Sequence, residues 1–351
     1  MQAVTFLAPL RVACAEVAEP RVERPTDAVV QIELAAICGS DLHVYRGVEV
    51  GLDVGTTLGH EFLGRVIAVG AAVQKVRVGD RVVAPFSVHC GACFFCEKGL
   101  TSRCEQSQLF GWVAQGRGLQ GAQAERVRVP LADSSLVPLP AGVPDPVALL
   151  AGDVLGTGFL AAEHAGVQRG DTVAVLGLGP VGLCAVLGAR DLGAGAVFAI
   201  DSVPERLELA ARYGGQPIDR SAQDAVAAVR ARTGGRGADV VIEAVGHPDA
   251  SVLAWQVARC GGVISAPGVH NEPQFALTPG QLYDKNLCYR AGRAPVGAAM
   301  PRLLARLQRG DLDLAPLFSH RLPLAAAADG YAMFDRKTAR CTKVLLEPRR
   351  S

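Results

Sequence analysis

Four cysteines stand within one short stretch of the chain: Cys90, Cys93, Cys96 and Cys104. Thiolates at two-residue spacings, with a fourth arriving within one loop, supply the ligands of a closed tetrahedral zinc site. The alternative is a set of free or disulfide-paired thiols, but three cysteines at this spacing cannot all pair locally without strain. A closed site has no position for water or substrate, so it stabilises a fold and performs no chemistry.

Two motifs upstream of this cluster carry reactive residue types. The first is the segment Cys38-Gly39-Ser40-Asp41-Leu42-His43, and the second is Gly59-His60-Glu61. A thiolate and a neutral imidazole are two of the three protein ligands of an open, catalytic zinc site. Taken alone, a residue such as Cys38 is more often a buried small hydrophobic residue, and one such as His60 a hydrogen-bonded loop residue. The metal hypothesis therefore needs a third ligand.

A glycine-rich loop, Gly177-Leu178-Gly179-Pro180-Val181-Gly182, follows an expected strand and opens an expected helix. Gly177 allows the tight turn, Gly179 lets the backbone approach a pyrophosphate, and Gly182 permits close packing of helix on strand. The free N–H groups of the helix N-terminus then face the phosphates. A glycine-rich turn in an ordinary α/β fold is the alternative, but the strand–loop–helix context favours a dinucleotide site.

Asp201 ends the next expected strand, 19 positions beyond Gly182. A carboxylate at this point accepts the hydroxyls of an adenosine ribose and repels a 2′-phosphate, which favours NAD over NADP. Arg206 lies five residues further on, but the adjacent Ser202 and Val203 offer no basic clamp for a phosphate.

Composition narrows the class of protein. The 351 residues are long for one core, so we expect two domains. Charges nearly cancel, 35 Lys and Arg against 34 Asp and Glu, which argues against a nucleic-acid-binding zinc ribbon and against a membrane-surface protein. Residues 147–167 are apolar but include Asp153, Glu163 and His164, so they do not predict a membrane span. With no signal peptide pattern and six scattered cysteines, we expect a cytoplasmic protein.

The pattern of secondary structure changes near residue 150. Before it, short β-rich runs are bounded by Gly, Pro and Asp, at 28–34, 63–69 and 80–84. After it, strands alternate with helices, which predicts βαβ units and a parallel sheet. The strands are expected at 172–176, 196–200, 239–243 and 262–266, and the helices at 181–192 and 204–213. A helix over 301–309 and a strand over 343–346 are also expected, and pattern alone assigns them to neither domain.

In their order, these motifs resemble the zinc-dependent medium-chain alcohol dehydrogenase family, and the resemblance covers essentially the whole chain. It implies an α/β fold in which a GroES-like, β-rich catalytic domain spans residues 1–154, with a structural zinc lobe at about 88–106. It further implies a Rossmann NAD-binding domain, a doubly wound parallel sheet, over 155–290, and a C-terminal segment, 291–351, that returns to the catalytic domain.

The resemblance also supplies the third catalytic ligand, which is cysteine in some members of the family and Asp or Glu in others. The matching residue is Asp153, so the predicted catalytic zinc is held by Cys38, His60 and Asp153, and a second zinc by the four cysteines. A carboxylate is a harder donor than a thiolate, and this pattern resembles the branch of secondary-alcohol, threonine, polyol and glutathione-independent formaldehyde dehydrogenases. Glu61 is expected beside the metal, approaching it when water or substrate leaves.

Further roles follow from the resemblance. Ser40 accepts the proton of the substrate alcohol, the cofactor ribose relays it, and His43 delivers it to solvent. Thr157 lines the nicotinamide, Lys343 reaches the pyrophosphate, and the backbone of Gly39 meets a phosphate. The full set of expected cofactor contacts is Gly39, Thr157, Gly177, Gly179, Pro180, Val181, Gly182, Asp201, Arg206, Val245, Gly268, Val269 and Lys343.

The predicted function is a zinc-dependent NAD oxidoreductase that interconverts a primary, secondary or polyol alcohol and its carbonyl compound, as a homodimer or homotetramer. The alternatives are a threonine-type or formaldehyde-type dehydrogenase, or a non-catalytic dinucleotide-binding protein. A zinc-free quinone or enoyl reductase of the same fold would lack the ligands Cys38, His60 and Asp153. Substrate identity is not predicted, since Phe110 and Trp112 are compatible with a pocket wall or with the core.

Overall fold

The computed structural model describes residues 1–348 and divides the chain into two compact units. One unit combines residues 1–156 with the segment from 295 onward and is called the terminal unit; the other, residues 157–294, is called the central unit. The sequence placed these boundaries at 154/155 and 290/291. Among the described residues, no helix is both long enough and apolar enough to span a lipid bilayer.

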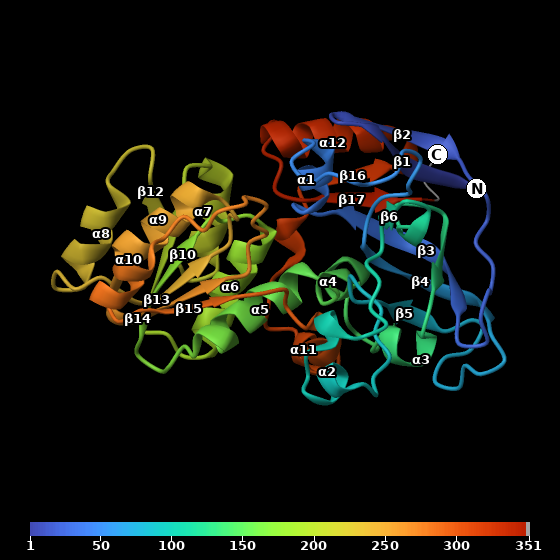
Figure 1. Ribbon diagram of the computed structural model, residues 1–351, viewed down its shortest axis with the longest axis horizontal. Coiled ribbons are helices and arrows are strands. Elements are labelled where there is room, and N and C mark those ends of the chain that lie inside the picture. The colour runs from blue at the N-terminus through green and yellow to red at the C-terminus, as the bar shows by residue number, and fades with distance from the viewer. Residues whose placement is uncertain (349–351) are drawn as a thin grey trace. The chain divides into compact units, whose positions relative to one another are not determined.

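The central unit is built on a six-stranded sheet in the order β12-β11-β10-β13-β14-β15, with every neighbouring pair parallel (Figure 1). The chain starts at β10 and moves outward in both directions, as in a Rossmann fold, so the strand order reverses between β10 and β13. The strands are β10 (Thr172–Leu176), β11 (Ala196–Asp201), β12 (Gln216–Asp219), β13 (Ala238–Glu243), β14 (Ala258–Ala266) and β15 (Cys288–Ala291). The predicted parallel sheet is confirmed.

Helices connect these strands, because parallel neighbours need long crossovers. They are α5 (Val154–Ala165), which leads into the unit, and α6 (Pro180–Asp191), α7 (Pro204–Arg212), α8 (Ala225–Arg232), α9 (Pro248–Val257) and α10 (Pro279–Asp284). Helix α6 begins with Gly179 as its N-cap and Pro180 in its first turn, where a missing N–H costs nothing.

The terminal unit is built on a seven-stranded, mainly antiparallel sheet in the order β16-β17-β3-β4-β5-β9, with β8 paired to β3. The C-terminal strand β17 pairs with β3, so the end of the chain completes the sheet formed near its beginning. The strands are β3 (Ala28–Ile37), β4 (Glu61–Val69), β5 (Arg81–Val83), β8 (Arg126–Val129), β9 (Val137–Pro138), β16 (His320–Pro323) and β17 (Val344–Glu347). Two ribbons, β1 (Gln2–Ala8) with β2 (Arg11–Glu16) and β6 (Trp112–Ala114) with β7 (Arg117–Leu119), complete the strands of this unit.

Short helices surround this sheet. They are α1 (Asp41–Tyr45), α2 (Phe94–Glu97), α3 (Ala132–Ser135), α4 (Asp145–Leu150), α11 (Val296–Leu307) and α12 (Ala327–Arg336), with 3-10 turns η1 (Thr101–Arg103), η2 (Ala315–Leu317) and η3 (Leu324–Ala326).

The helix expected over 301–309 begins five residues earlier, at Val296, and contains Pro301 in its interior. A proline inside a helix removes one backbone hydrogen bond. Here a continuous apolar face offsets that loss, because its side chains are buried: Val296, Met300, Leu303, Leu304 and Leu307. The predicted bounds were wrong at both ends, since α11 spans Val296–Leu307, and the start was misplaced because proline is favoured in the first turn of a helix.

The open question about Phe110 and Trp112 is answered by burial. Phe110 is 3% exposed and meets Phe62 of β4 edge-on, with ring centroids 5.1 Å apart. Trp112 is half-buried against the same core cluster. Phe110 therefore belongs to the core of the terminal unit, and Trp112 packs on that core with part of its surface exposed.

The glycine loop of the central unit gives a test of its packing. A Cβ on Gly182 would lie 1.8 Å from the carbonyl oxygen of Gly177, whereas a Cβ on Gly179 would meet nothing within 4 Å. We expect Gly182→Ala to lower the unfolding free energy by about 1–3 kcal/mol through overpacking, despite alanine's higher helix propensity of about 1 kcal/mol. Gly179→Ala, the matched control, should change it by less than about 0.5 kcal/mol. Calorimetric melting of both variants checks this, and equal stability would contradict the packing role of Gly182.

Candidate active site

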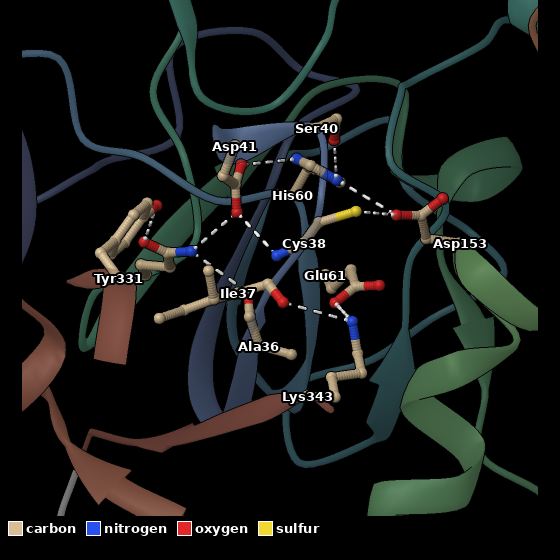
Figure 2. Close-up of polar contacts among 11 residues, drawn as sticks. Ala36, Ile37, Cys38, Ser40, Asp41, His60, Glu61, Asp153, Tyr331 and Lys343 are labelled. Carbon is tan, nitrogen blue, oxygen red and sulfur yellow. Dashed lines mark hydrogen bonds and ion pairs between the residues drawn. The ribbon is translucent and has the colours of Figure 1, made fainter. Parts of the chain in front are cut away.

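Cys38, His60 and Asp153 lie together in the terminal unit, although they come from three separate segments (Figure 2). Strands β3 and β4 are antiparallel with Ala36 opposite Glu61, so the end of one strand adjoins the start of the other. This register brings Cys38 and His60 to the same edge of the sheet. Asp153, between α4 and α5, completes the group: the Cys38 Sγ lies 3.1 Å and the His60 Nε2 3.2 Å from its Oδ2.

The three donor atoms fit a metal ion. All lie within 4.8 Å of one another. Zinc bonds of about 2.0–2.3 Å at a tetrahedral angle separate their donor atoms by roughly 3.4–3.8 Å. The two contacts made by Asp153 are within a few tenths of an ångström of that spacing. A thiolate, an imidazole and a carboxylate are also the donor types that zinc accepts.

Electrostatics point to a cation at the same place. Burial, followed by the charges of Asp153 and Glu61, raises the pKa of Cys38 to about 11. Burial also raises the pKa of Asp153, but the hydrogen bond and charge of His60 outweigh it, and the pKa lies below its usual value. Burial lowers the pKa of His60, yet Asp41 and Cys38 outweigh it, and the pKa lies well above its usual value. A bound dication would replace these protons, since metal ligation favours the thiolate and the neutral imidazole.

Helix α1 carries the predicted proton relay. Ser40 is its N-cap, and the Ser40 Oγ lies 3.3 Å from the His60 Nε2, on the side that faces Cys38 and Asp153. His43 is half-buried one turn along the helix. Gly39 is exposed, and a Cβ there would meet nothing within 4 Å, so its backbone is open to a neighbouring group.

Glu61 and Lys343 form a fully buried ion pair beside the three ligands. The Lys343 Nζ lies 2.6 Å from Glu61 Oε2 and 3.4 Å from the carbonyl oxygen of Ile37. Burial raises the pKa of Glu61 to about 7, although Lys343 opposes the shift. Within residues 1–348, the second oxygen of Glu61, Oε1, has no hydrogen-bond partner. The expected contact of Lys343 with a pyrophosphate stays a prediction. It requires the ammonium group to bind a phosphate oxygen in addition to Glu61.

The four-cysteine lobe has the form that its spacing predicted. Its sulfur atoms lie within 4.8 Å of one another, and none of the described cysteines forms a disulfide. Backbone N–H groups point at these sulfurs: Cys93 N donates to Cys90 Sγ at 3.3 Å and Gln106 N to Cys104 Sγ at 3.3 Å. Backbone hydrogen bonds at Glu105 and Cys96 lower the pKa of Cys93 to about 6, which favours a thiolate there, whereas burial raises the pKa of Cys96 to about 12 and also raises that of Cys104. A bound cation would favour the thiolate form of all four cysteines.

The predicted cofactor residues of the central unit gather at the carboxyl edge of its sheet. The loop from Gly177 to Gly182 follows β10, and Asp201 ends the neighbouring β11. The Asp201 Oδ2 accepts the Leu178 N–H of this loop at 2.6 Å, and the Arg206 Nη1 lies 3.8 Å from the same oxygen. Thr157, in α5, is buried, as are Pro180 and Gly182, while Val181 is half-buried.

The predicted residues after β13 and β14 lie at the same edge. Val245 and Val269 are 44% and 42% exposed, which is unusual for valine and leaves two apolar side chains open at the carboxyl ends of the strands. Gly268 packs on the loop after β13, since a Cβ there would lie 2.5 Å from Gly246 N.

Sequence reasoning missed Glu243, which holds this edge together. Its fully buried carboxylate accepts the N–H groups of Val245 at 2.7 Å and Gly246 at 2.9 Å, and His270 Nε2 lies 2.8 Å from its other oxygen. The sequence did offer one indication of a role for Glu243, which is an acidic residue at the carboxyl end of an expected buried strand.

Asp41 lies in the first motif, but its residue type and spacing predicted no role for it. Its buried carboxylate lies behind the metal-ligand group, with Oδ1 3.2 Å from His60 Nδ1 and Oδ2 accepting the Cys38 N–H at 3.0 Å. A histidine ligand is commonly oriented by such a carboxylate on its other nitrogen.

A thiolate–imidazole–carboxylate group, a four-cysteine group and a Rossmann unit are the features of a metal-dependent dehydrogenase of the dinucleotide-binding class. Comparison with known proteins gives the family. The profile described as "Alcohol dehydrogenase GroES-like domain" matches residues 24–141, and that described as "Zinc-binding dehydrogenase" matches residues 180–308. The chain belongs to the zinc-dependent medium-chain alcohol dehydrogenase family and is an enzyme of the alcohol dehydrogenase type.

Individual relatives cover nearly the whole chain. Zinc-type alcohol dehydrogenase B of Aspergillus flavus is 40% identical over 347 residues, 95% of this chain and 79% of that protein. The zinc-type alcohol dehydrogenase-like protein AdhB of Bacillus subtilis is 36% identical over 379 residues, 99% of this chain and 100% of that protein. The structure of alcohol dehydrogenase TADH from Thermus sp. ATN1 has a TM-score of 0.92 at 43% identity and covers 99% of both chains. The predicted family, fold class and enzyme class are confirmed.

The buried Glu61–Lys343 pair predicts a non-additive stability effect. We expect Lys343→Met to lower the unfolding free energy by about 3–5 kcal/mol, because it leaves an uncompensated buried carboxylate. The double variant Glu61→Gln/Lys343→Met should cost less than the sum of its single changes. Scanning calorimetry of Glu61→Gln, Lys343→Met and the double variant measures these costs. Arg321→Met, which breaks an exposed pair with Glu347 on the neighbouring strands, is the control and should cost less than about 1 kcal/mol. Additive single effects would contradict the buried ion pair.

Proposed function

We propose that this protein is a two-zinc, NAD-linked dehydrogenase that interconverts an alcohol and its aldehyde or ketone. The observation that carries the proposal is the convergence of Cys38 Sγ, His60 Nε2 and Asp153 Oδ2 within 4.8 Å, next to the hydroxyl of Ser40. Three protein donors and a fourth, open direction are the arrangement of a catalytic zinc site, whereas four protein donors make a structural one.

We assign separate roles in metal binding to different residues. Cys38, His60 and Asp153 would hold the catalytic zinc, and Cys90, Cys93, Cys96 and Cys104 the structural zinc. A bound zinc acts as a Lewis acid that lowers the pKa of an alcohol, as it does for water. Glu61, whose Oε1 has no partner among the described residues, would offer an additional carboxylate oxygen beside the three ligands.

The alcohol proton needs a path out of the site. Ser40 Oγ lies on the metal-facing side of His60, where it can accept that proton. His43 follows in the same helix and is half-buried, and imidazole is the side-chain type most often used to pass a proton to solvent.

Asp201 supports NAD as the cofactor. Its carboxylate ends β11 and is fixed by the N–H groups of Leu178, Ser202 and Val203, so a negative charge is anchored beside the glycine loop. Structural neighbours at 27% identity include a Sinorhizobium meliloti protein bound to NADP and an Escherichia coli protein complexed with NADH. Since neighbours take either nucleotide, the choice for this chain rests on Asp201.

The substrate proposal stops at the class of alcohols. Relatives carry different substrate names, among them the L-threonine 3-dehydrogenase of Bacillus licheniformis at 31% identity over 94% of this chain. A homodimer or homotetramer is expected from the family resemblance. An activity screen over primary, secondary, polyol and hydroxy-amino-acid substrates with NAD would identify the substrate.

Metal content tests the site directly. Elemental analysis should find two zinc ions per chain in the purified protein and one in Asp153→Asn and His60→Ala, with turnover lost but NAD still bound. His43→Ala should keep both ions and slow turnover roughly ten- to a hundredfold, as expected for loss of a proton-transfer group. Cys260→Ser, at an exposed cysteine outside both clusters, is the control and should retain both ions. One zinc per chain in the unmodified protein would overturn the catalytic site, and inactive, zinc-depleted His43→Ala would overturn the relay.

Cofactor choice is tested by kinetics. A 2′-phosphate placed against the Asp201 carboxylate should cost a few kcal/mol, or on the order of a hundredfold in kcat/KM relative to NAD. Asp201→Gly should narrow this ratio, because it removes the opposing charge. Comparable kcat/KM values for NAD and NADP in the unmodified enzyme would contradict the proposal, and an unchanged ratio in the variant would contradict the role of Asp201.

A further inference from the structure

Behind the metal-ligand group lies a chain of buried polar side chains that the reaction itself does not use. It starts at Asp41, which contacts His60 Nδ1 and the Cys38 N–H (Figure 2). It continues through Gln123, which contacts Asp41, to Tyr331 of helix α12. Gln123 and Tyr331 are both fully buried. Neither stands in the motifs that carry the zinc ligands.

The hydrogen bonds fix the direction of every donor in this chain. The Gln123 Nε2 lies 3.1 Å from Asp41 Oδ2 and 3.2 Å from the carbonyl oxygen of Ala36. An ionised carboxylate and a carbonyl only accept, so the amide nitrogen must face them. The Gln123 Oε1 then faces Tyr331, whose hydroxyl donates to it at 2.9 Å.

Packing holds Gln123 in this orientation. A Cβ on Gly59, the residue before His60, would lie 2.3 Å from Gln123 Cγ, and Gly59 has a φ of +89°. The glutamine side chain therefore lies directly on the backbone that leads into the His60 ligand. Only glycine at position 59 allows both this φ and this contact without strain.

Tyr331 supplies a donor that does not change with pH in the working range. Burial, followed by the charge of Asp41, raises the pKa of its phenol well above the usual value. Its ring also packs on Tyr45 of α1, with centroids 5.3 Å apart. The phenol thus stays neutral, and its ring is held against α1, the helix that follows Ser40 and contains His43.

We propose that Gln123 and Tyr331 are positioning residues of the catalytic zinc site, which act through Asp41 to hold His60 with Nδ1–H toward Asp41 and Nε2 toward the metal. Asp41 has two fixed donors on Oδ2, the Cys38 N–H and Gln123 Nε2, so its Oδ1 is left to receive the His60 Nδ1–H. Without Gln123, the carboxylate loses one of its two anchors and the imidazole loses its fixed orientation. This inference rests on the proposed zinc site.

The test is zinc affinity at the catalytic site, measured by competition with a chromophoric chelator on the full-length protein. Partners behind a metal ligand typically contribute about ten- to a hundredfold to metal affinity. We expect Gln123→Met, which keeps side-chain length but removes the bond to Asp41, to weaken the catalytic zinc by about tenfold or more. Tyr331→Phe, which removes one hydroxyl, should weaken it by a smaller factor. The four-cysteine zinc should keep its affinity in both variants.

Tyr45→Phe is the matched control, because it removes a hydroxyl from the same buried aromatic pair without touching Gln123. It should bind both zinc ions as the unmodified protein does. Long-range ¹H–¹⁵N spectra of histidine-labelled, zinc-loaded protein give a second readout, in which Gln123→Met should alter the His60 ring signals and Tyr45→Phe should not.

The outcomes separate this inference from the proposed function. If the unmodified protein binds a single zinc, both fail. If it binds two, and Gln123→Met and Tyr331→Phe release the catalytic zinc no more readily than Tyr45→Phe, the positioning role is wrong while the zinc site stands. Equal weakening of both zinc ions would also overturn it, since that would indicate a general loss of stability. If Tyr331→Phe does not fold, Gln123→Met alone decides between these results.

Discussion

The terminal unit depends on one electrostatic constraint, the burial of several acidic groups in one small space. Cys38, Asp41, Glu61 and Asp153 are each less than a tenth exposed, and they lie around a single imidazole. Like charges in a poorly solvated region repel strongly unless cations or hydrogen-bond donors compensate them. Lys343 compensates Glu61, backbone and amide donors compensate Asp41, and a metal ion would compensate Cys38 and Asp153.

Part of this compensation comes from the C-terminal segment. The acids lie in residues 38–153, but Lys343 and Tyr331 lie in the segment from 295 onward, whose strand β17 pairs with β3. The same segment contributes apolar side chains to the core of the terminal unit, including Leu324, Phe334 and Leu346. The C-terminal segment therefore completes both the core and the charge balance around the ligands.

Residue type and spacing made part of the fold and of the candidate site predictable. The four cysteines, the glycine loop with Asp201, and the alternating strands and helices are local patterns, and each predicts its own short-range geometry. Asp153 was reached through family resemblance. The roles of Gln123 and Tyr331, and the pairing of Lys343 with Glu61, were not predictable in this way, because they arise from contacts between residues far apart in sequence. Lys343, for example, meets a carboxylate 282 positions away. The early start of α11 was missed for a related reason, since its buried face outweighs Pro301.

A buried polar network carries a cost that explains why its members must act together. Each donor or acceptor left unsatisfied in the interior costs about 1–3 kcal/mol, so a partly formed network is worse than an apolar core. Around His60 each of these polar groups has a hydrogen-bond partner. Asp41 accepts a hydrogen bond from the Gln123 amide nitrogen, and the Gln123 amide oxygen accepts one from the Tyr331 phenol. The donor-to-acceptor direction of these hydrogen bonds leaves His60 Nδ1 facing an acceptor and Nε2 facing Cys38 and Asp153. The fold thus orients the ligand from behind, by satisfying polar groups that would otherwise destabilise its core.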